Sequence, residues 1–147
     1  MQTTAGITLA GLLRPNILSA LAQGEITRPP VIWLELGSCT GESISLNNTQ
    51  DPDLKQLLLE MVEMRYHWLF NATFGEPALD IIEKTAREDE GKFILVVEGS
   101  VVTREEGRYN IIGARNNRLI TGIETLKELA PKAKYVVAVG ACAAFGG

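Results

Sequence analysis

The stretch VIWLELGSCTGES, residues 31–43, joins a nearly continuous apolar run to a loop of small residues. An apolar run of this length is typical of a strand that is covered on both faces of a sheet. The runs FILVV, residues 93–97, and YVVAV, residues 135–139, have the same character, and each is followed within two residues by a glycine. Residues 62–68, VEMRYHW, alternate apolar and polar side chains and indicate a strand with one less buried face. The sequence therefore predicts four strands, of which the first is covered on both faces and the run at residues 93–97 is fully apolar.

Segments of helical periodicity separate these strands. Residues 51–53, DPD, have the composition of a helix start, residues 76–88 form a second predicted helix, and residues 117–130 form a third that Pro131 ends. The side chains expected on the buried faces are Leu54, Leu57, Leu58 and Met61 in the first helix, Leu79, Ile82 and Ala86 in the second, and Leu119, Ile123, Leu126 and Ala130 in the third. Alternating strands and helices predict an α/β fold, in which a parallel sheet carries helices on both faces.

The size and charge of the chain exclude several classes of protein. Its 147 residues suit one domain, and a net charge of −4 argues against a nucleic-acid partner. We expect an amino-terminal extension over residues 1–29, with a short docking helix, and one domain over residues 30–147. No apolar run is long enough to cross a bilayer, and no export signal is recognisable at the start. These features predict a location in the cytoplasm or at the inner face of the membrane.

Side chains that can bind metal ions or accept hydrogen bonds follow three of the predicted strands. Cys39, Glu98 and Cys142 each come just after a buried strand, and parallel sheets bind ligands beyond the carboxyl ends of their strands. The two cysteines are 103 positions apart, and without an export signal a structural disulfide is not expected. Thiolates in glycine-rich loops suit an iron–sulfur cluster, copper(I) or zinc. Two cysteines do not complete such a site, so spacing alone leaves these alternatives open.

Three motifs resemble those of nickel–iron hydrogenase small subunits. The loop GSCTGES, residues 37–43, is similar to the family's first cluster loop, in which a strand delivers a Cys-x-Gly-Cys motif. Residues 96–100, VVEGS, resemble its Val-Glu-Gly segment. Residues 140–147, GACAAFGG, are similar to its third motif, Gly-x-Cys-Ala-x-x-Gly-Gly. The resemblance runs from about residue 30 to residue 147, and details of residues 43–54 favour the cytoplasmic uptake and sensory group.

This resemblance implies a fold, a cofactor and a partner. The fold is a flavodoxin-like doubly wound parallel sheet, apparently incomplete at its carboxyl end. The cofactor is a proximal 4Fe–4S cluster that receives electrons from hydrogen oxidation, with Cys39 and Cys142 as its first and third ligands. The partner is a large subunit that holds the catalytic nickel–iron centre, so no catalytic residue is expected in this chain.

Two departures from the family pattern bear on the cluster. Glu42 occupies the position of the family's second cysteine, where its carboxylate is a candidate oxygen ligand to iron, with water, Ser38 or Ser43 as alternatives. The family's fourth cysteine lies beyond Gly147. Either another chain supplies the fourth ligand and the onward electron path, or the sequence is a shortened chain, or the protein has lost the cluster.

Alternative functions remain at this stage. A hydrogen-sensing complex would use the same subunits. A flavodoxin-like module for a nucleotide or flavin, having lost the cluster, would need a phosphate-binding glycine motif that the first loop lacks. A cluster subunit of respiratory complex I would carry an adjacent cysteine pair, which is also missing. Among other residues, we expect His67 to have a packing or surface role, and Trp33 and Trp68 to be core or interface anchors. Glu98 is expected to accept hydrogen bonds, and Glu35 to face a partner or pair with a cation.

Overall fold

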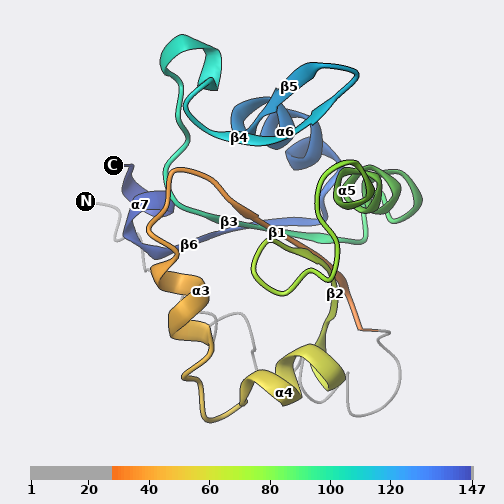
Figure 1. Cartoon of the computed structure of the whole chain (residues 1–147). Coiled ribbons are helices and arrows are strands. Elements are labelled where there is room, and N and C mark those ends of the chain that lie inside the picture. The colour runs from red at the N-terminus through yellow and green to blue at the C-terminus, as the bar shows by residue number, and fades with distance from the viewer. Residues whose placement is uncertain (1–27, 147) are drawn as a thin grey trace.

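Four parallel strands form the central sheet, in the order β2-β1-β3-β6 (Figure 1). They span Pro30–Glu35 (β1), Glu63–His67 (β2), Ile94–Glu98 (β3) and Tyr135–Val139 (β6). The structure is a computed structural model that describes residues 28–146, so the expected docking helix near the amino terminus lies outside the described residues. The four strands fall where the sequence predicted them. Their order is that of a flavodoxin-like doubly wound sheet, which confirms the expected fold class.

Helices cover both faces of the sheet. Figure 1 shows α5 (Glu76–Glu88) and α6 (Gly122–Leu129) on one face, and α3 (Gly41–Leu46) with α4 (Leu54–Gln56) on the other. A π-helical turn, Leu57–Met61, continues α4, and the short helix α7 (Gly140–Phe145) follows β6 directly. A one-turn 3₁₀ helix spans Ala130–Lys132, and the segment Arg104–Gly107 is a turn in which Glu105 and Glu106 have positive φ. The result is a three-layer arrangement in which the sheet is the middle layer.

Each face of the sheet has its own apolar core, because successive strand residues point to opposite faces. The core under α5 and α6 consists of Ile32, Leu34, Leu36, Ile82, Ala86, Phe93, Leu95, Val97 and Leu129. The core on the α3 and α4 side consists of Val31, Trp33, Leu46, Leu57, Met61, Val96, Val137 and Val139. The continuous apolar runs of β1 and β3 therefore reflect burial on both faces, as the sequence indicated.

The structure confirms the predicted bounds of the second helix but not those of the third. Helix α5 has the predicted bounds, and Leu79, Ile82 and Ala86 are buried on it. The third predicted helix begins later, because residues 118–121 form the strand β5 (Arg118–Thr121), which pairs antiparallel with β4 (Ile111–Arg115). Our placement of a helix start near residue 117 was therefore wrong.

The sequence between β4 and β5 explains this error. Asn116 and Asn117 both have positive φ, 51° and 60°, which is the backbone of a two-residue hairpin turn that favours asparagine. The hairpin leaves Leu119 55% exposed, although the helical pattern placed it in the core. Thr121 then caps α6 by accepting a hydrogen bond from the Glu124 N–H at 3.3 Å.

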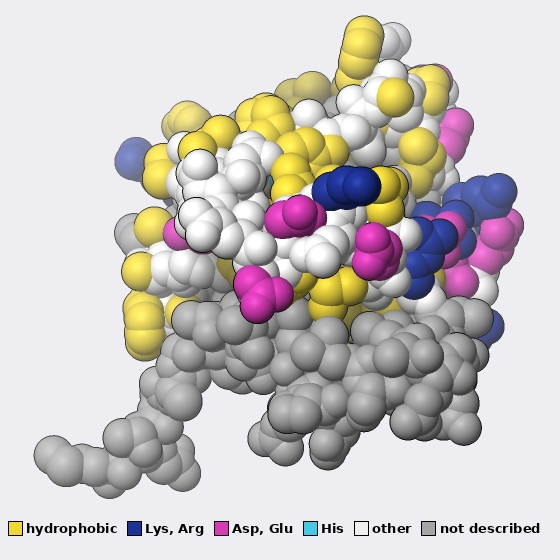
Figure 2. All heavy atoms as spheres, turned by 90° about the horizontal axis from the view of Figure 1, so that it is seen from below, with side chains coloured by type: hydrophobic (Ala, Val, Ile, Leu, Met, Phe, Trp, Pro, Cys, Tyr) yellow, Lys and Arg dark blue, Asp and Glu magenta, His cyan; other side chains and the backbone are white. Residues whose placement is uncertain are grey.

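The surface on the α3 and α4 side mixes apolar and acidic side chains. Figure 2 shows this face, with most of the visible lysines and arginines near one margin. The described part of the face thus carries no broad basic patch. Within residues 28–146, no helix has the length and apolar character needed to span a bilayer.

Candidate functional site

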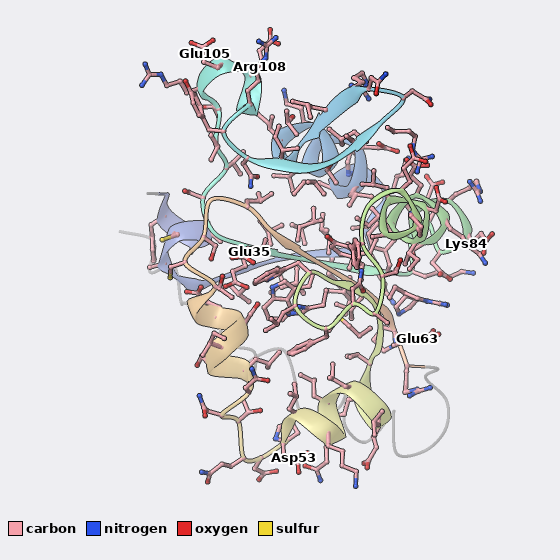
Figure 3. All side chains as sticks on the ribbon, viewed as in Figure 1. Glu35, Asp53, Glu63, Lys84, Glu105 and Arg108 are labelled. Atoms are coloured by element: carbon pink, nitrogen blue, oxygen red, sulfur yellow. The ribbon has the colours of Figure 1, made fainter. Side chains whose placement is uncertain are left out.

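The carboxyl ends of β1, β3 and β6 lie side by side. In the parallel register, Glu98 at the end of β3 is the partner of Glu35 on β1 and of Val139 on β6. The segments that carry Cys39 and Cys142 therefore leave the sheet on either side of Glu98. Figure 3 shows the labelled Glu35 at this edge, while Asp53, Lys84 and Glu105 lie at the periphery. The three strand ends therefore lie at one edge of the sheet, as predicted, while a common site for the three side chains stays a prediction.

The loops after β1 and β3 are held together by their backbones. The Gly37 N–H donates to the Ser100 carbonyl at 2.9 Å, and the Ser100 N–H donates back to the Gly37 carbonyl at 3.1 Å. Gly99, with φ of +87°, lies so close to this loop that a Cβ atom on it would be 2.6 Å from the Cβ of Ser38. The Val-Glu-Gly segment therefore needs its glycine because the two loops approach closely.

Both cysteines are free and exposed at this edge. Cys39 precedes α3, and a Cβ atom on Gly41 would lie 3.1 Å from the Cys39 sulfur. Cys142 lies in the first turn of α7, three residues after β6 ends. The two thiols thus border the edge from opposite sides of β3, in loops where glycines leave room around them.

Glu42 connects the two cysteine-bearing segments. It lies in the first turn of α3, and its carboxylate lies against Gly140, where a Cβ atom would overlap it. Gly140 has φ of +80°, a conformation that L side chains rarely adopt. The side chain at the position of the family's second cysteine therefore faces the start of the helix that carries Cys142.

Glu98 is fully buried and accepts four hydrogen bonds. The donors are the Trp33 indole N–H at 2.9 Å, the Ser38 hydroxyl at 3.2 Å, and both the N–H and the hydroxyl of Ser43, at 3.3 and 2.5 Å. Burial alone would raise the pKa of Glu98, but the hydrogen bonds from Ser43, Trp33 and Ser38 offset it and hold the pKa below its ordinary value. The carboxylate is therefore ionised, as an acceptor of hydrogen bonds, in the role expected from the sequence.

His67 extends this network away from the sheet edge. It is fully buried and packs between Trp33 and Phe70, with ring centroids 4.9 and 4.3 Å from its own. The Leu69 N–H donates to Nδ1 at 3.2 Å, so the ring proton belongs on Nε2, which lies 3.3 Å from the Ser43 hydroxyl oxygen. Burial lowers the pKa of His67 to about 4, although the Glu98 charge opposes the shift. The expected packing role is confirmed, and a polar role is added.

The Ser43, His67 and Glu98 side chains do not form a nucleophilic triad. In such a triad the carboxylate orients the histidine through Nδ1, whereas here Nδ1 accepts from the backbone and the carboxylate binds the serine. All three residues are also fully buried, so no substrate reaches the hydroxyl. Sequence reasoning missed this cluster, since 24 positions separate Ser43 from His67 and 55 separate it from Glu98.

Glu35 and the tryptophans complete the surroundings. The Glu35 carboxylate accepts a hydrogen bond from the Thr40 hydroxyl at 2.6 Å, and burial together with repulsion from Glu98 raises its pKa despite that bond. Of the two roles expected for Glu35, pairing with a lysine or arginine is not found among the described residues, and contact with a partner subunit stays a prediction. Trp33 is buried, as predicted for a core residue, whereas Trp68 is 42% exposed.

The donor set fits an iron–sulfur cluster in part. Cys39 and Cys142 supply soft thiolates, Glu42 supplies an oxygen donor, and Gly41 and Gly140 leave the backbone open beside them. Within residues 28–146, no three His, Cys, Asp or Glu side chains lie close enough together to hold a single metal ion. The types of donor present thus suit part of a cluster's ligand set, and the assignment of the ligands stays a prediction.

Comparison with known families gives one match over most of the chain. A family model described as "NADH ubiquinone oxidoreductase, 20 Kd subunit" matches residues 39–147, a range that includes both cysteines and Glu98. This family name refers to the respiratory enzyme that the sequence left as an alternative. The individual relatives carry another name.

Curated relatives are hydrogenase small subunits. The chain is 37% identical over 97% of its length to the periplasmic NiFeSe hydrogenase small subunit of Desulfomicrobium baculatum, and covers 47% of that protein. It is 30% identical over 82% of its length to the hydrogenase-2 small chain of Escherichia coli K12, and covers 31% of it. The chain thus spans half or less of these relatives' length. The cytoplasmic location expected from the sequence stays a prediction.

Solved structures agree with these relatives. The oxidised NiFeSe hydrogenase from Desulfovibrio vulgaris Hildenborough matches with a TM-score of 0.80 and 43% identity, over 83% of this chain and 43% of that one. The reduced Ni-Fe-Se hydrogenase from Desulfomicrobium baculatum matches with the same TM-score and 40% identity, over 82% of this chain and 45% of that one. The chain belongs to the family of the NADH–ubiquinone oxidoreductase 20 Kd subunit, and its resemblance to nickel–iron hydrogenase small subunits is confirmed.

Proposed function

We propose that this chain is the electron-transfer part of a nickel–iron hydrogenase, in which a large subunit oxidises hydrogen and residues 30–147 hold the first cluster. The observation that carries this proposal is the contact between Glu42 and Gly140, which joins the Cys39 segment to the Cys142 helix. The contact lies at the edge of a sheet that matches hydrogenase small subunits with a TM-score of 0.80. We propose Cys39, Cys142 and Glu42 as the ligands in this chain.

The proposed roles of these residues are structural and electronic. A bound 4Fe–4S cluster would accept and release single electrons. The thiolates of Cys39 and Cys142 would hold two of its irons from opposite sides of β3, and the Glu42 carboxylate, a harder donor, would hold a third. Backbone N–H groups of the glycine-containing loops are suited to donate hydrogen bonds to cluster sulfurs, which tunes the reduction potential. A residue of another segment or another chain must supply the remaining ligand.

Anaerobic purification of the full-length protein from its native host tests the hydrogenase proposal. We expect a large partner that contains nickel, together with iron and hydrogen-dependent reduction of a viologen dye. Cys39→Ala should abolish dye reduction by the small-subunit route while leaving nickel in the partner. A protein that is isolated without nickel, iron or such a partner would contradict the proposal, and a yellow flavin in its place would favour the nucleotide-binding alternative.

The role of Glu42 has a test of its own. We propose that its carboxylate is a ligand, so Glu42→Ala should change the electron paramagnetic resonance (EPR) spectrum of the reduced cluster, and Glu42→Cys, which replaces an oxygen donor by a thiolate, should change it in a different way while retaining the iron. Glu63→Gln, on the exposed side of β2, is the matched control. An unchanged spectrum in Glu42→Ala would show that the carboxylate does not bind iron.

A further inference from the structure

We infer that Glu98 is a positioning residue, which fixes the segment from Ser38 to Ser43 and thereby places Cys39 and Glu42 for a cluster. This segment consists of the loop after β1 and the first turn of α3, and is called the first loop below. The placing of Cys39 and Glu42 for a cluster rests on the proposed function. The fixing of the loop does not, and it has a separate measurement. Neither the family match nor the relatives' names assign a role to this carboxylate.

The hydrogen bonds of Glu98 bracket the candidate ligands. One carboxylate oxygen accepts from the Ser38 hydroxyl, immediately before Cys39, and from the Ser43 N–H, immediately after Glu42. The other oxygen accepts from the Ser43 hydroxyl and from Trp33 in the same strand that leads into the loop. Both ends of the loop are therefore tied to one group on β3.

The loop conformation requires such a tie. Thr40, at its centre, has φ of +66°, a left-handed conformation that is unfavourable for a β-branched residue. Its N–H donates to the Ser38 hydroxyl oxygen at 3.0 Å, and that same hydroxyl donates to Glu98. The carboxylate thus supports the unfavourable backbone at Thr40 through Ser38.

The position of Glu98 suits this role. Glu98 ends β3, the strand that lies between β1 and β6. Its register partners are Glu35 and Val139, which are the last residues of the two strands that lead to Cys39 and Cys142. Rigid strands position side chains more accurately than loops do. Tying the first loop to β3 therefore fixes that loop relative to the segment that carries Cys142.

A carboxylate is needed because every neighbour donates. Trp33 and the Ser43 N–H are donors only, and the Ser43 hydroxyl gives its proton to Glu98 because His67 Nε2–H occupies its oxygen. An amide at position 98 would have one acceptor oxygen and an NH₂ group that faces donors. Among the described residues no lysine or arginine forms an ion pair with Glu98, so the hydrogen bonds alone stabilise its charge.

The experiment compares full-length Glu98→Gln and Ser38→Ala with wild type and with Glu63→Gln as control. Hydrogen exchange is measured on protein freed of metal by a chelator, so this reading does not depend on the cluster. We expect amides of residues 38–43 to exchange about tenfold faster or more in Glu98→Gln, since a buried hydrogen bond to a charged group is lost. Amides of β6 should keep their wild-type rate. Wild-type exchange of residues 38–43 in Glu98→Gln would overturn the inference.

Ser38→Ala keeps the carboxylate and guards against a Glu98→Gln protein that does not fold. It removes the acceptor of the Thr40 N–H, so faster exchange confined to residues 38–43 is expected. Wild-type exchange there would contradict the tie between Glu98 and Thr40.

The second reading uses the anaerobically purified holoprotein. We expect lower iron content, an altered EPR spectrum of the reduced cluster and a more positive midpoint potential in Glu98→Gln, because a negative charge near the cluster is lost. Faster loop exchange with an unchanged iron content and spectrum would overturn the positioning role. If wild type itself holds no iron, the proposed function fails, while the exchange measurement still decides whether Glu98 fixes the loop.

Discussion

At the scale of single residues, His67 makes the free energy of unfolding depend on pH between about pH 4 and pH 6.5. It is the only histidine of the chain, and burial lowers its pKa from 6.5 to about 4. As the pH is lowered, the unfolded chain binds a proton at this histidine near pH 6.5, whereas the folded chain binds it only near pH 4. The free energy of unfolding is therefore undiminished above pH 6.5 and decreases as the pH is lowered from 6.5 to 4.

This dependence is measurable in the free energy of unfolding. We expect it to fall by about 2 kcal/mol between pH 7 and pH 5 in wild type. His67→Gln should be less stable at pH 7 and should lose most of that slope. Glu35, whose raised pKa stabilises the fold toward acid pH, is present in both proteins and cancels in the comparison. Equal slopes by denaturant unfolding at the two pH values would contradict the buried, neutral histidine.

Gly140 provides a second test at this scale. Gly140→Ala must place a Cβ atom where the Glu42 carboxylate lies, in addition to the strain of positive φ. Gly91, with φ of +71° and open space around it, is the matched control for strain alone. We expect both alanine variants to lose about 1–2 kcal/mol of stability, and only Gly140→Ala to lose iron. Equal iron in the two variants, measured after anaerobic purification, would show that the Glu42 contact has no part in the site.

Some of these residues were predictable from the sequence and others were not. Cys39, Glu98 and Cys142 were recognisable, because each follows an apolar run and parallel strands end at a common edge. The contact of Ser43 with Glu98 and His67 depends on how a loop, an edge strand and a central strand pack together. The spacing of apolar residues cannot predict such hydrogen-bonded pairs. A buried polar residue interrupts the apolar pattern, but the pattern does not indicate which residue it contacts.

At the scale of elements, the segment from β4 to α6 shows how local turn chemistry overrides periodicity. The spacing of apolar residues suggested one helix over 117–130, but the Asn116-Asn117 turn reverses the chain and converts residues 118–121 to a strand. The helix proper is shorter, and Leu129 at its end is fully buried. The asparagine pair at residues 116 and 117 is the sequence signal that favours the hairpin over a continuous helix.

Substitutions of two leucines distinguish the continuous helix that the spacing predicts from the observed hairpin and shorter helix. Leu129→Ala should cost about 2–5 kcal/mol, since it leaves a cavity in the core under α5 and α6. Leu119→Ala should change stability by less than about 0.5 kcal/mol, because that side chain is mostly exposed on β5. Thermal and denaturant unfolding of both variants gives the comparison. A similar large loss at Leu119 would support the continuous helix over the hairpin.

At the scale of the whole molecule, the fold separates a rigid scaffold from an open edge. The two apolar cores lie within the three layers, whereas both thiols are exposed where β1 and β6 end. The described residues thus form a packed frame that carries two exposed thiols at one edge of its sheet.

The central claim is that Cys39 and Cys142 hold an iron–sulfur cluster, and iron and acid-labile sulfide in anaerobically purified full-length protein test it most directly. We predict that Cys39→Ala and Cys142→Ala each lose about four iron and about four sulfide per molecule relative to wild type, and that one EPR signal of the reduced protein disappears. Hydrogen exchange of β3 at the wild-type rate would show that both variants are folded. Unchanged iron and sulfide in both folded variants would contradict the account.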